Sequence, residues 1–182
     1  DAGLEVSDRI RVAYQSDDWA PIEPYFAADA VYEIPGVPGP IGGSMKGRAA
    51  ILAYFKALDA ASPRVEVEIL GKTTLGEDLF LAAVSSEANL ANKKRLQEIA
   101  RKIADPRGLT EAETDALVRE GKVFLFITCN IHSTEIGASQ MAMEWAYALA
   151  TAQDAETKRR LDDVVLLLLP SINPDGQIME TE

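Results

Sequence analysis

The sequence contains a single histidine, His132, and a glutamate three residues after it, Glu135. The pair follows the apolar run 123–128, which predicts a strand, and precedes an apolar stretch that predicts a helix. An imidazole and a carboxylate at this spacing can meet one metal ion, and these are ligands that zinc takes in hydrolytic sites. A catalytic zinc usually has three protein ligands, and this sequence offers no second imidazole. The residues therefore predict part of a zinc site, with His132 and Glu135 as its metal ligands.

Each of these residues also has a purely structural interpretation. His132 would then be a hydrogen-bonded histidine at the end of a strand, and Glu135 an acidic residue that the dipole favours in the first turn of a helix. The interpretation of Glu135 is compatible with metal binding. Cys129 precedes His132 by three residues and could complete a triad of ligands, but an unpaired cysteine more often packs in the core. Residues 173–176, Asn-Pro-Asp-Gly, have the composition of a turn.

Composition and charge exclude several classes of function. The 182 residues suggest one domain or two small ones, and 47% hydrophobic with 26% charged residues is typical of a protein with a packed core. A net charge of −11 argues against non-specific binding to nucleic acid or to anionic lipid. The longest apolar run, 164–169, is too short to span a membrane. A single cysteine excludes an internal disulfide and a multi-cysteine zinc site.

The N-terminal third of the sequence predicts a mainly helical segment. The expected elements are helices over residues 3–15 and 17–26, a strand over 30–34, a loop rich in Gly and Pro over 35–44, and an amphipathic helix over 48–61.

The remainder predicts an α/β fold with a mixed sheet flanked by helices. Two strands, 64–70 and 79–84, form a hairpin, and helices at 89–104 and 110–120 follow, the second with a Thr110–Glu113 capping box. The expected elements after residue 120 are a buried strand over 123–128, helices over 135–150 and 154–163, a central strand over 164–169 and a loop over 170–176.

The alternation of strand, helix and strand predicts parallel strands joined by a helical crossover. Ligands bind beyond the carboxyl ends of such strands. If strands 123–128 and 164–169 are adjacent, the loops that carry His132 and residues 173–176 become neighbours.

Residues from about 49 to the end resemble the zinc carboxypeptidase family. The matching segments are 62–65 (Ser-Pro-Arg-Val), 70–73 (Leu-Gly-Lys-Thr), 130–138 (Asn-Ile-His-Ser-Thr-Glu-Ile-Gly-Ala) and 170–176 (Pro-Ser-Ile-Asn-Pro-Asp-Gly). The resemblance implies zinc as cofactor, with His132 and Glu135 as its first two ligands. It also implies hydrolysis of the peptide bond next to a free C-terminus, with a peptide or protein C-terminus as substrate.

The same resemblance implies that the site is incomplete. The family's third ligand (a histidine), its carboxylate-binding arginines and its glutamate base lie downstream of the last position in this sequence. The expectation is a truncated domain over residues 49–182 that is inactive alone. Residue 1 is Asp, and no signal peptide follows it, as in a cleaved mature protein or a piece of a longer one. The resemblance is compatible with a secreted or periplasmic location.

Residues from about 7 to 58 resemble a different fold, the SnoaL-like or nuclear-transport-factor-2-like cone. The matching segments are 14–19, 25–36 and 46–51. This resemblance assigns residues 1–48 to a SnoaL-like N-terminal segment. It leaves two alternatives to the peptidase: a small-molecule-binding module, and a chimeric chain without catalytic activity.

Overall fold

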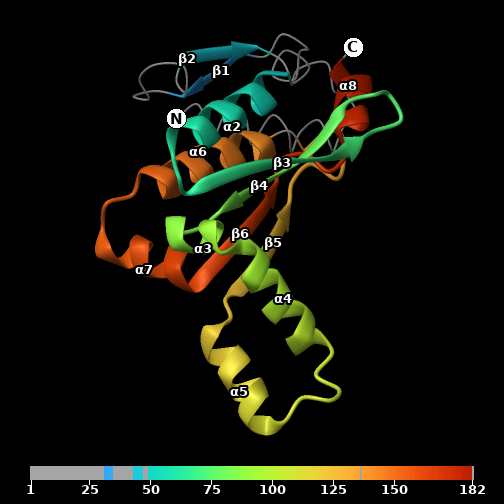
Figure 1. Cartoon of the computed structure of the whole chain (residues 1–182). Coiled ribbons are helices and arrows are strands. Elements are labelled where there is room, and N and C mark those ends of the chain that lie inside the picture. Colours follow the sequence, from blue (N-terminus) through green and yellow to red (C-terminus); the bar gives the residue numbers. More distant parts are fainter. Residues whose placement is uncertain (1–30, 35–42, 47–48, 136, 182) are drawn as a thin grey trace, which may run out of the picture.

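The computed structural model describes residues 31–34, 43–46, 49–135 and 137–181 (Figure 1). In order, the elements are β1 (Val31–Ile34), β2 (Gly43–Lys46), α2 (Ala49–Ala61), β3 (Val65–Lys72), β4 (Asp78–Val84), α3 (Glu87–Ala91), α4 (Lys93–Ala104), α5 (Glu111–Glu120), β5 (Val123–Thr128), α6 (Gly137–Thr151), α7 (Ala155–Asp163), β6 (Val164–Leu169) and α8 (Pro174–Thr181). None of the helices in these ranges is both long and apolar enough to cross a membrane.

A four-stranded mixed sheet is the centre of the fold, in the order β3-β4-β6-β5. β3 and β4 form an antiparallel hairpin, and β4 pairs antiparallel with β6. β5 pairs in parallel with β6 along its whole length, from Val123 opposite Val164 to Thr128 opposite Leu169. The predicted hairpin, mixed sheet and adjacency of the last two strands are confirmed.

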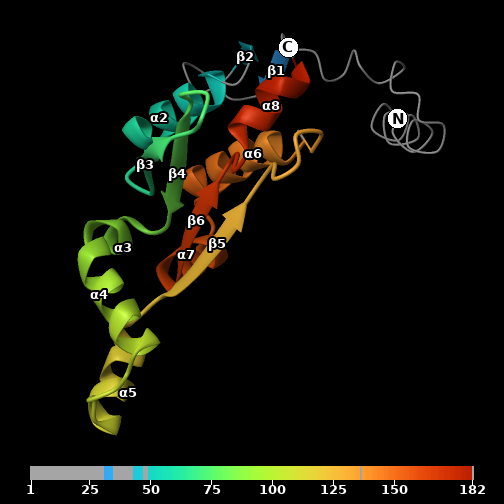
Figure 2. The same cartoon turned by 90° about the vertical axis from the view of Figure 1, so that its right-hand side faces the viewer.

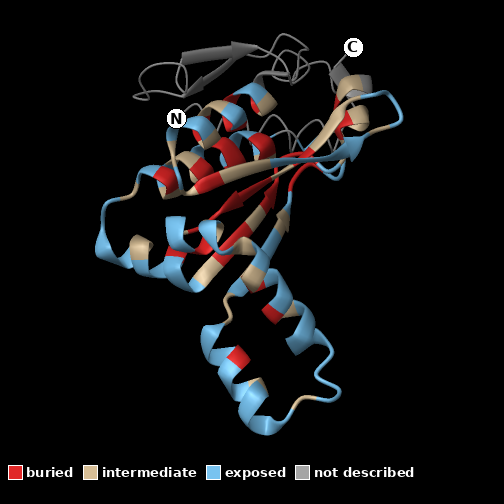
Figure 3. Ribbon diagram, in the orientation of Figure 1, coloured by how far each residue is buried: buried red, intermediate tan, exposed pale blue. Residues whose placement is uncertain are grey.

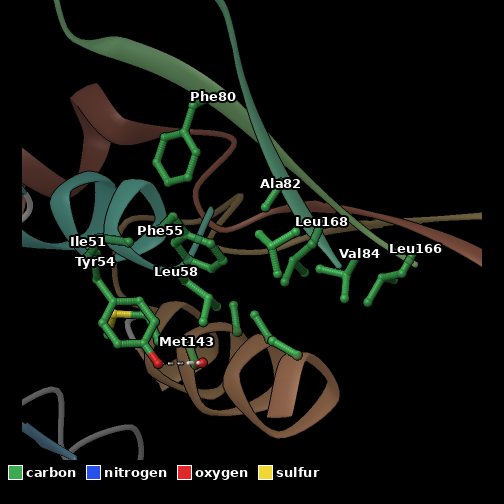
Figure 4. Close-up of a cluster of buried hydrophobic side chains, with 14 of the residues drawn as sticks. Ile51, Tyr54, Phe55, Leu58, Phe80, Ala82, Val84, Met143, Leu166 and Leu168 are labelled. Atoms are coloured by element: carbon green, nitrogen blue, oxygen red, sulfur yellow. Dashed lines mark hydrogen bonds between the residues drawn. The ribbon is translucent and has the colours of Figure 1, made fainter. Parts of the chain in front are cut away.

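The larger core lies between one face of the sheet and helices α2 and α6. Tyr54 and Phe55 of α2 are almost fully buried, and Phe55 lies against Phe80 of β4 with ring centroids 5.5 Å apart (Figure 4). The Tyr54 hydroxyl donates a hydrogen bond to the Met143 carbonyl of α6 at 3.2 Å. Burial raises the pKa of Tyr54 to about 12. This core fixes α2 and α6 on the sheet.

A smaller core covers the opposite face. Leu96 and Ile99 of α4 and Leu117 of α5 cluster with Val165 of β6. β6 alternates accordingly, since Leu166 and Leu168 belong to the larger core. The α4–α5 hairpin extends away from the sheet, and most of its surface is exposed (Figures 1 and 3). The predicted burial of β6 on both faces is confirmed.

Helix α5 begins with the predicted capping box. The Thr110 hydroxyl accepts a hydrogen bond from the Glu113 amide, and the Glu113 carboxylate accepts one from the Thr110 amide at 2.8 Å. Both hydrogen bonds satisfy amides that a helix N-terminus otherwise leaves unpaired.

β5 is not the buried strand that its apolar sequence predicted. It forms one edge of the sheet, and within the described ranges no strand pairs with its outer side (Figure 2). Val123 is 63% exposed and Phe126 is 58% exposed. The other edge strand, β3, carries the charged residues Glu66 and Glu68 in its interior. Charges of this kind protect an edge against pairing with another chain, and β5 has none.

The predicted helix over 89–104 is also wrong as a single element. It is divided at Asn92 into α3 and α4, because Asn92 has φ −104° and ψ 17°, outside the helical region. The predicted loop over 170–176 ends early, since α8 begins at Pro174.

In the N-terminal third, β1 and β2 form a two-stranded antiparallel sheet. The strand predicted over 30–34 is confirmed at Val31–Ile34, whereas residues 43 and 44, which were predicted as loop, belong to β2. The rest of the predicted loop, residues 35–42, lies outside the described residues. The predicted helices over 3–15 and 17–26 lie outside the described residues.

The exposed apolar edge leads to a prediction about self-association. Phe126→Lys should reduce concentration-dependent association of the 182-residue chain, because a lysine on an edge strand opposes pairing with a second edge. It should leave folding stability within about 0.5 kcal/mol, as for other exposed positions. Sedimentation velocity over a concentration series measures the association.

Val118→Lys is the matched control, because Val118 is also 58% exposed but lies on α5. It should behave as the unmodified chain does. Equal association of the two variants would contradict the expectation that the outer edge of β5 pairs with a second chain.

Candidate functional site

The loops after β5 and β6 lie beside each other at the carboxyl edge of the sheet. Beyond the last strand residues, the Cys129 amide donates to the Leu169 carbonyl and the Ile172 amide donates to the Cys129 carbonyl, both at 2.9 Å. The pairing of the two strands therefore continues into the loops. The predicted proximity of the His132 loop and residues 173–176 is confirmed, since the Asn173 side chain reaches the Ile131 carbonyl.

His132 and Glu135 face each other in the loop after β5. The His132 Nδ1 atom lies 2.8 Å from Glu135 Oε1. The Glu135 amide donates to the His132 carbonyl at 3.1 Å, which closes the loop as a turn. The two side chains are 72% and 51% exposed, so an ion from solvent can reach both. The structure brings together the two residues that the sequence singled out.

The electrostatics of this pair keep the carboxylate charged. Hydrogen bonds from the His132 side chain, and then from the His132 amide, hold the pKa of Glu135 below its usual range. A carboxylate has to be ionised to bind a metal. Glu135 is therefore in the state that a metal ligand needs.

The distance between the two donor atoms is close to what zinc requires. Bond lengths of 2.0–2.2 Å at a tetrahedral angle put two ligand atoms about 3.4 Å apart, so the pair would open by about 0.6 Å to admit the ion. Exposed side chains can make that adjustment by small rotations. The imidazole nitrogen and the carboxylate oxygen are therefore of a type and at a separation that suit two of the ligands of a zinc ion.

A third ligand is not found in the part of the chain that the structure describes. No group of three His, Cys, Asp or Glu side chains there is placed to hold a metal ion. Cys129 is only 4% exposed and belongs to the larger core, and burial raises the pKa of its thiol. The expectation that Cys129 packs in the core is confirmed.

Glu135 does not lie in the first turn of a helix, as its structural interpretation assumed. Helix α6 begins at Gly137, after Glu135. The Glu135 carboxylate belongs to the loop before α6, and its orientation follows from its hydrogen bonds with His132.

Two polar residues that sequence reasoning missed anchor this loop from inside the protein. Asn130 and Ser139 are 2% and 0% exposed. The Asn130 Nδ2 group donates to the Ser139 hydroxyl at 2.8 Å, and that hydroxyl donates to the Pro170 carbonyl at 2.6 Å. Asn130 has φ 54°, in the left-handed region that asparagine adopts more readily than most residues. It turns the chain out of β5 and ties it to α6 and to the end of β6.

The chain is similar to known proteins in sequence and in fold. A sequence model of the family described as zinc carboxypeptidase matches residues 51–182. Among solved structures, the carboxypeptidase A from Helicoverpa armigera is similar over 89% of the chain, with 15% identity and a TM-score of 0.53. A metallo-carboxypeptidase from Burkholderia cenocepacia is similar over 75% of the chain, with 18% identity and a TM-score of 0.50. A search of curated proteins found no match.

The coverage of these structures is partial. The chain spans 33% of the Helicoverpa structure and 29% of the Burkholderia structure. At these identities the likeness concerns the fold, a mixed sheet flanked by helices. The resemblance of residues 7–58 to the SnoaL-like fold has no support in the comparisons, and most of those residues lie outside the described ranges.

Two substitutions at Asn130 separate the contribution of its backbone conformation to stability from that of its side chain. Asn130→Ala should lower the free energy of unfolding by about 1–3 kcal/mol, because alanine is strained at positive φ and the buried hydrogen bond is lost. Asn130→Gly loses the same hydrogen bond without the strain, so it should be more stable than the alanine variant by about 1 kcal/mol. Urea denaturation measures both, and equal stabilities would contradict the backbone role.

Proposed function

Because the chain belongs to the zinc carboxypeptidase family, we propose that it is a metallocarboxypeptidase-like hydrolase domain in which His132 and Glu135 bind zinc. The observation that carries this proposal is the approach of His132 Nδ1 to Glu135 Oε1 at 2.8 Å. The pair lies inside the matched range and at the carboxyl edge of parallel strands, where sites form in sheets of this kind.

The chemistry assigned to the pair is binding and orientation. A bound zinc would supply Lewis acidity toward a peptide carbonyl and lower the pKa of a bound water. His132 would offer the Nδ1 lone pair of the tautomer that carries its proton on Nε2, and Glu135 would offer a carboxylate that is already ionised. Because both side chains are exposed, water or substrate could reach a zinc ion that they held.

We infer that the substrate class is a peptide or protein with a free C-terminus. This inference takes the substrate from the structures that share the fold, which are described as carboxypeptidases. It extends to hydrolysis of the C-terminal peptide bond.

Hydrolysis by the pair alone is not part of the proposal. His132 is the only histidine among the 182 residues, so a second imidazole ligand has to come from outside this sequence. We propose that a third ligand and a general base from further polypeptide complete the site, and that this chain is inactive without them. No observation favours a SnoaL-like pocket or a chimeric chain as the alternative.

Zinc titration of the purified chain tests the metal assignment. The chain should bind one zinc ion, and His132→Ala should weaken that binding at least about tenfold, since it removes the only imidazole. Glu135→Gln should also weaken it, because a neutral amide is a poor zinc ligand. Isothermal titration calorimetry measures each dissociation constant.

Glu144→Gln is the control, because it makes the same charge change at an exposed residue of α6. It should bind zinc as the unmodified chain does. Zinc binding that survives His132→Ala would contradict the assignment.

A peptidase assay tests the need for further groups. The zinc-loaded chain should release no C-terminal amino acid from a peptide with a free carboxylate, and its C-terminally amidated counterpart serves as the blank. Mass spectrometry detects any shortened product. Release that depends on His132 would show that the chain already contains a sufficient site, contrary to the proposed requirement.

A further inference from the structure

Residues 173–176 lie beside the candidate metal loop, residues 131–135, and contact it through Asn173. We propose that Asn173 is a positioning residue, which holds the Ile131 peptide so that His132 and Glu135 converge. The effect on zinc rests on the proposed function, but the effect on the loop itself does not.

The Asn173 amide makes two hydrogen bonds at once. Its Nδ2 group donates to the Ile131 carbonyl at 3.0 Å, and its Oδ1 atom accepts from the Gly176 amide at 3.0 Å. The second hydrogen bond is the N-cap of α8 and fixes the orientation of the amide plane. The hydrogen bond to the Ile131 carbonyl then joins the loop after β6 to the peptide that precedes His132.

Packing contributes little to the position of this loop. Ile131 is 59% exposed, and the His132 side chain is 72% exposed. Exposed segments of this kind open at low free energy unless hydrogen bonds hold them. The hydrogen bond from Asn173 attaches to the residue adjacent to the candidate ligand, which makes it well placed to restrict the loop.

Gly176 makes room for this arrangement. A Cβ atom at Gly176 would lie 2.4 Å from Asn173 Nδ2 and 2.8 Å from its Cγ, far inside contact distance. Any larger residue would therefore push the Asn173 side chain away from Ile131. The glycine is explained by the close approach of this amide.

The start of α8, which follows Asn173, is itself attached to the rest of the fold. Pro174 is buried at the first position of α8, where proline suits a helix. The Asp175 carboxylate accepts hydrogen bonds from the Thr73 hydroxyl and, at 3.1 Å, from the Leu75 amide, so it fastens α8 to the β3–β4 turn. The position of Asn173 is thus set independently of the metal loop.

Residues that orient ligands without touching the ion typically change affinity 10- to 100-fold when they are replaced. The same size of effect is expected from Asn173.

Asn173→Ser tests the proposal in the full 182-residue chain. Serine is as good an N-cap as asparagine, so α8 should persist, but its side chain is too short to reach Ile131. Zinc should bind about tenfold more weakly. In the metal-free chain, the hydrogen-bonded amides of His132 and Glu135 should exchange faster with solvent, as measured by NMR.

Gly176→Ala provides an independent route to the same state, because it displaces the Asn173 side chain without changing that residue. It should reproduce both effects. Asn92→Ser is the matched control, since Asn92 is an exposed N-cap residue of α4 that makes no side-chain cap hydrogen bond. It should change neither zinc affinity nor exchange in the metal loop.

The outcomes separate this inference from the proposed function. Unchanged amide exchange at His132 and Glu135 in Asn173→Ser would overturn the positioning role, whether or not zinc binds. Faster exchange throughout the chain, with a lower melting temperature, would also overturn it, because the role would then be general stability. Faster exchange confined to the metal loop would support it, even if the unmodified chain bound no zinc and the proposed function failed.

Discussion

The parallel pairing of β5 with β6 is the constraint on which the candidate site depends. Two strands that run in the same direction end at the same edge, and the loops that follow them must then share a small volume. Here the hydrogen bonds continue past the strands through Cys129 and Ile172. His132 is thereby brought next to residues 173–176, although about forty positions of sequence separate them. Without this pairing the two conspicuous sequence segments would be unrelated surface loops.

Of the two strands, β6 is the more firmly fixed, because it is packed on both faces. Its residues alternate between the larger core under α2 and α6 and the smaller core under α4 and α5. β5 contributes less to either core and is open along its outer side in the described part of the chain. The asymmetry leaves the candidate site at one margin of the sheet, where additional polypeptide has access to it. That location agrees with the proposal that a third ligand comes from further polypeptide.

Local patterns in the sequence predicted most of the elements and the two candidate ligands. Alternation, apolar runs and the Thr110–Glu113 pair are properties of neighbouring residues, so they can be read without a structure. The exposure of β5 could not be read in this way, because an apolar strand is buried only if something packs on it. Asn-Pro-Asp-Gly at 173–176 has the composition of a turn, yet asparagine as N-cap and proline at the first position also begin a helix. The hydrogen bond from Asn173 to Ile131 joins distant segments, and no local pattern contains it.

The central claim is that His132 and Glu135 share one zinc ion. A crystal of the chain soaked in zinc, measured on both sides of the zinc absorption edge, locates the ion without reference to activity. The account predicts an anomalous peak about 2.0–2.2 Å from both His132 Nδ1 and a Glu135 carboxylate oxygen. A peak bound to other side chains, with the two residues still hydrogen-bonded to each other, would contradict it.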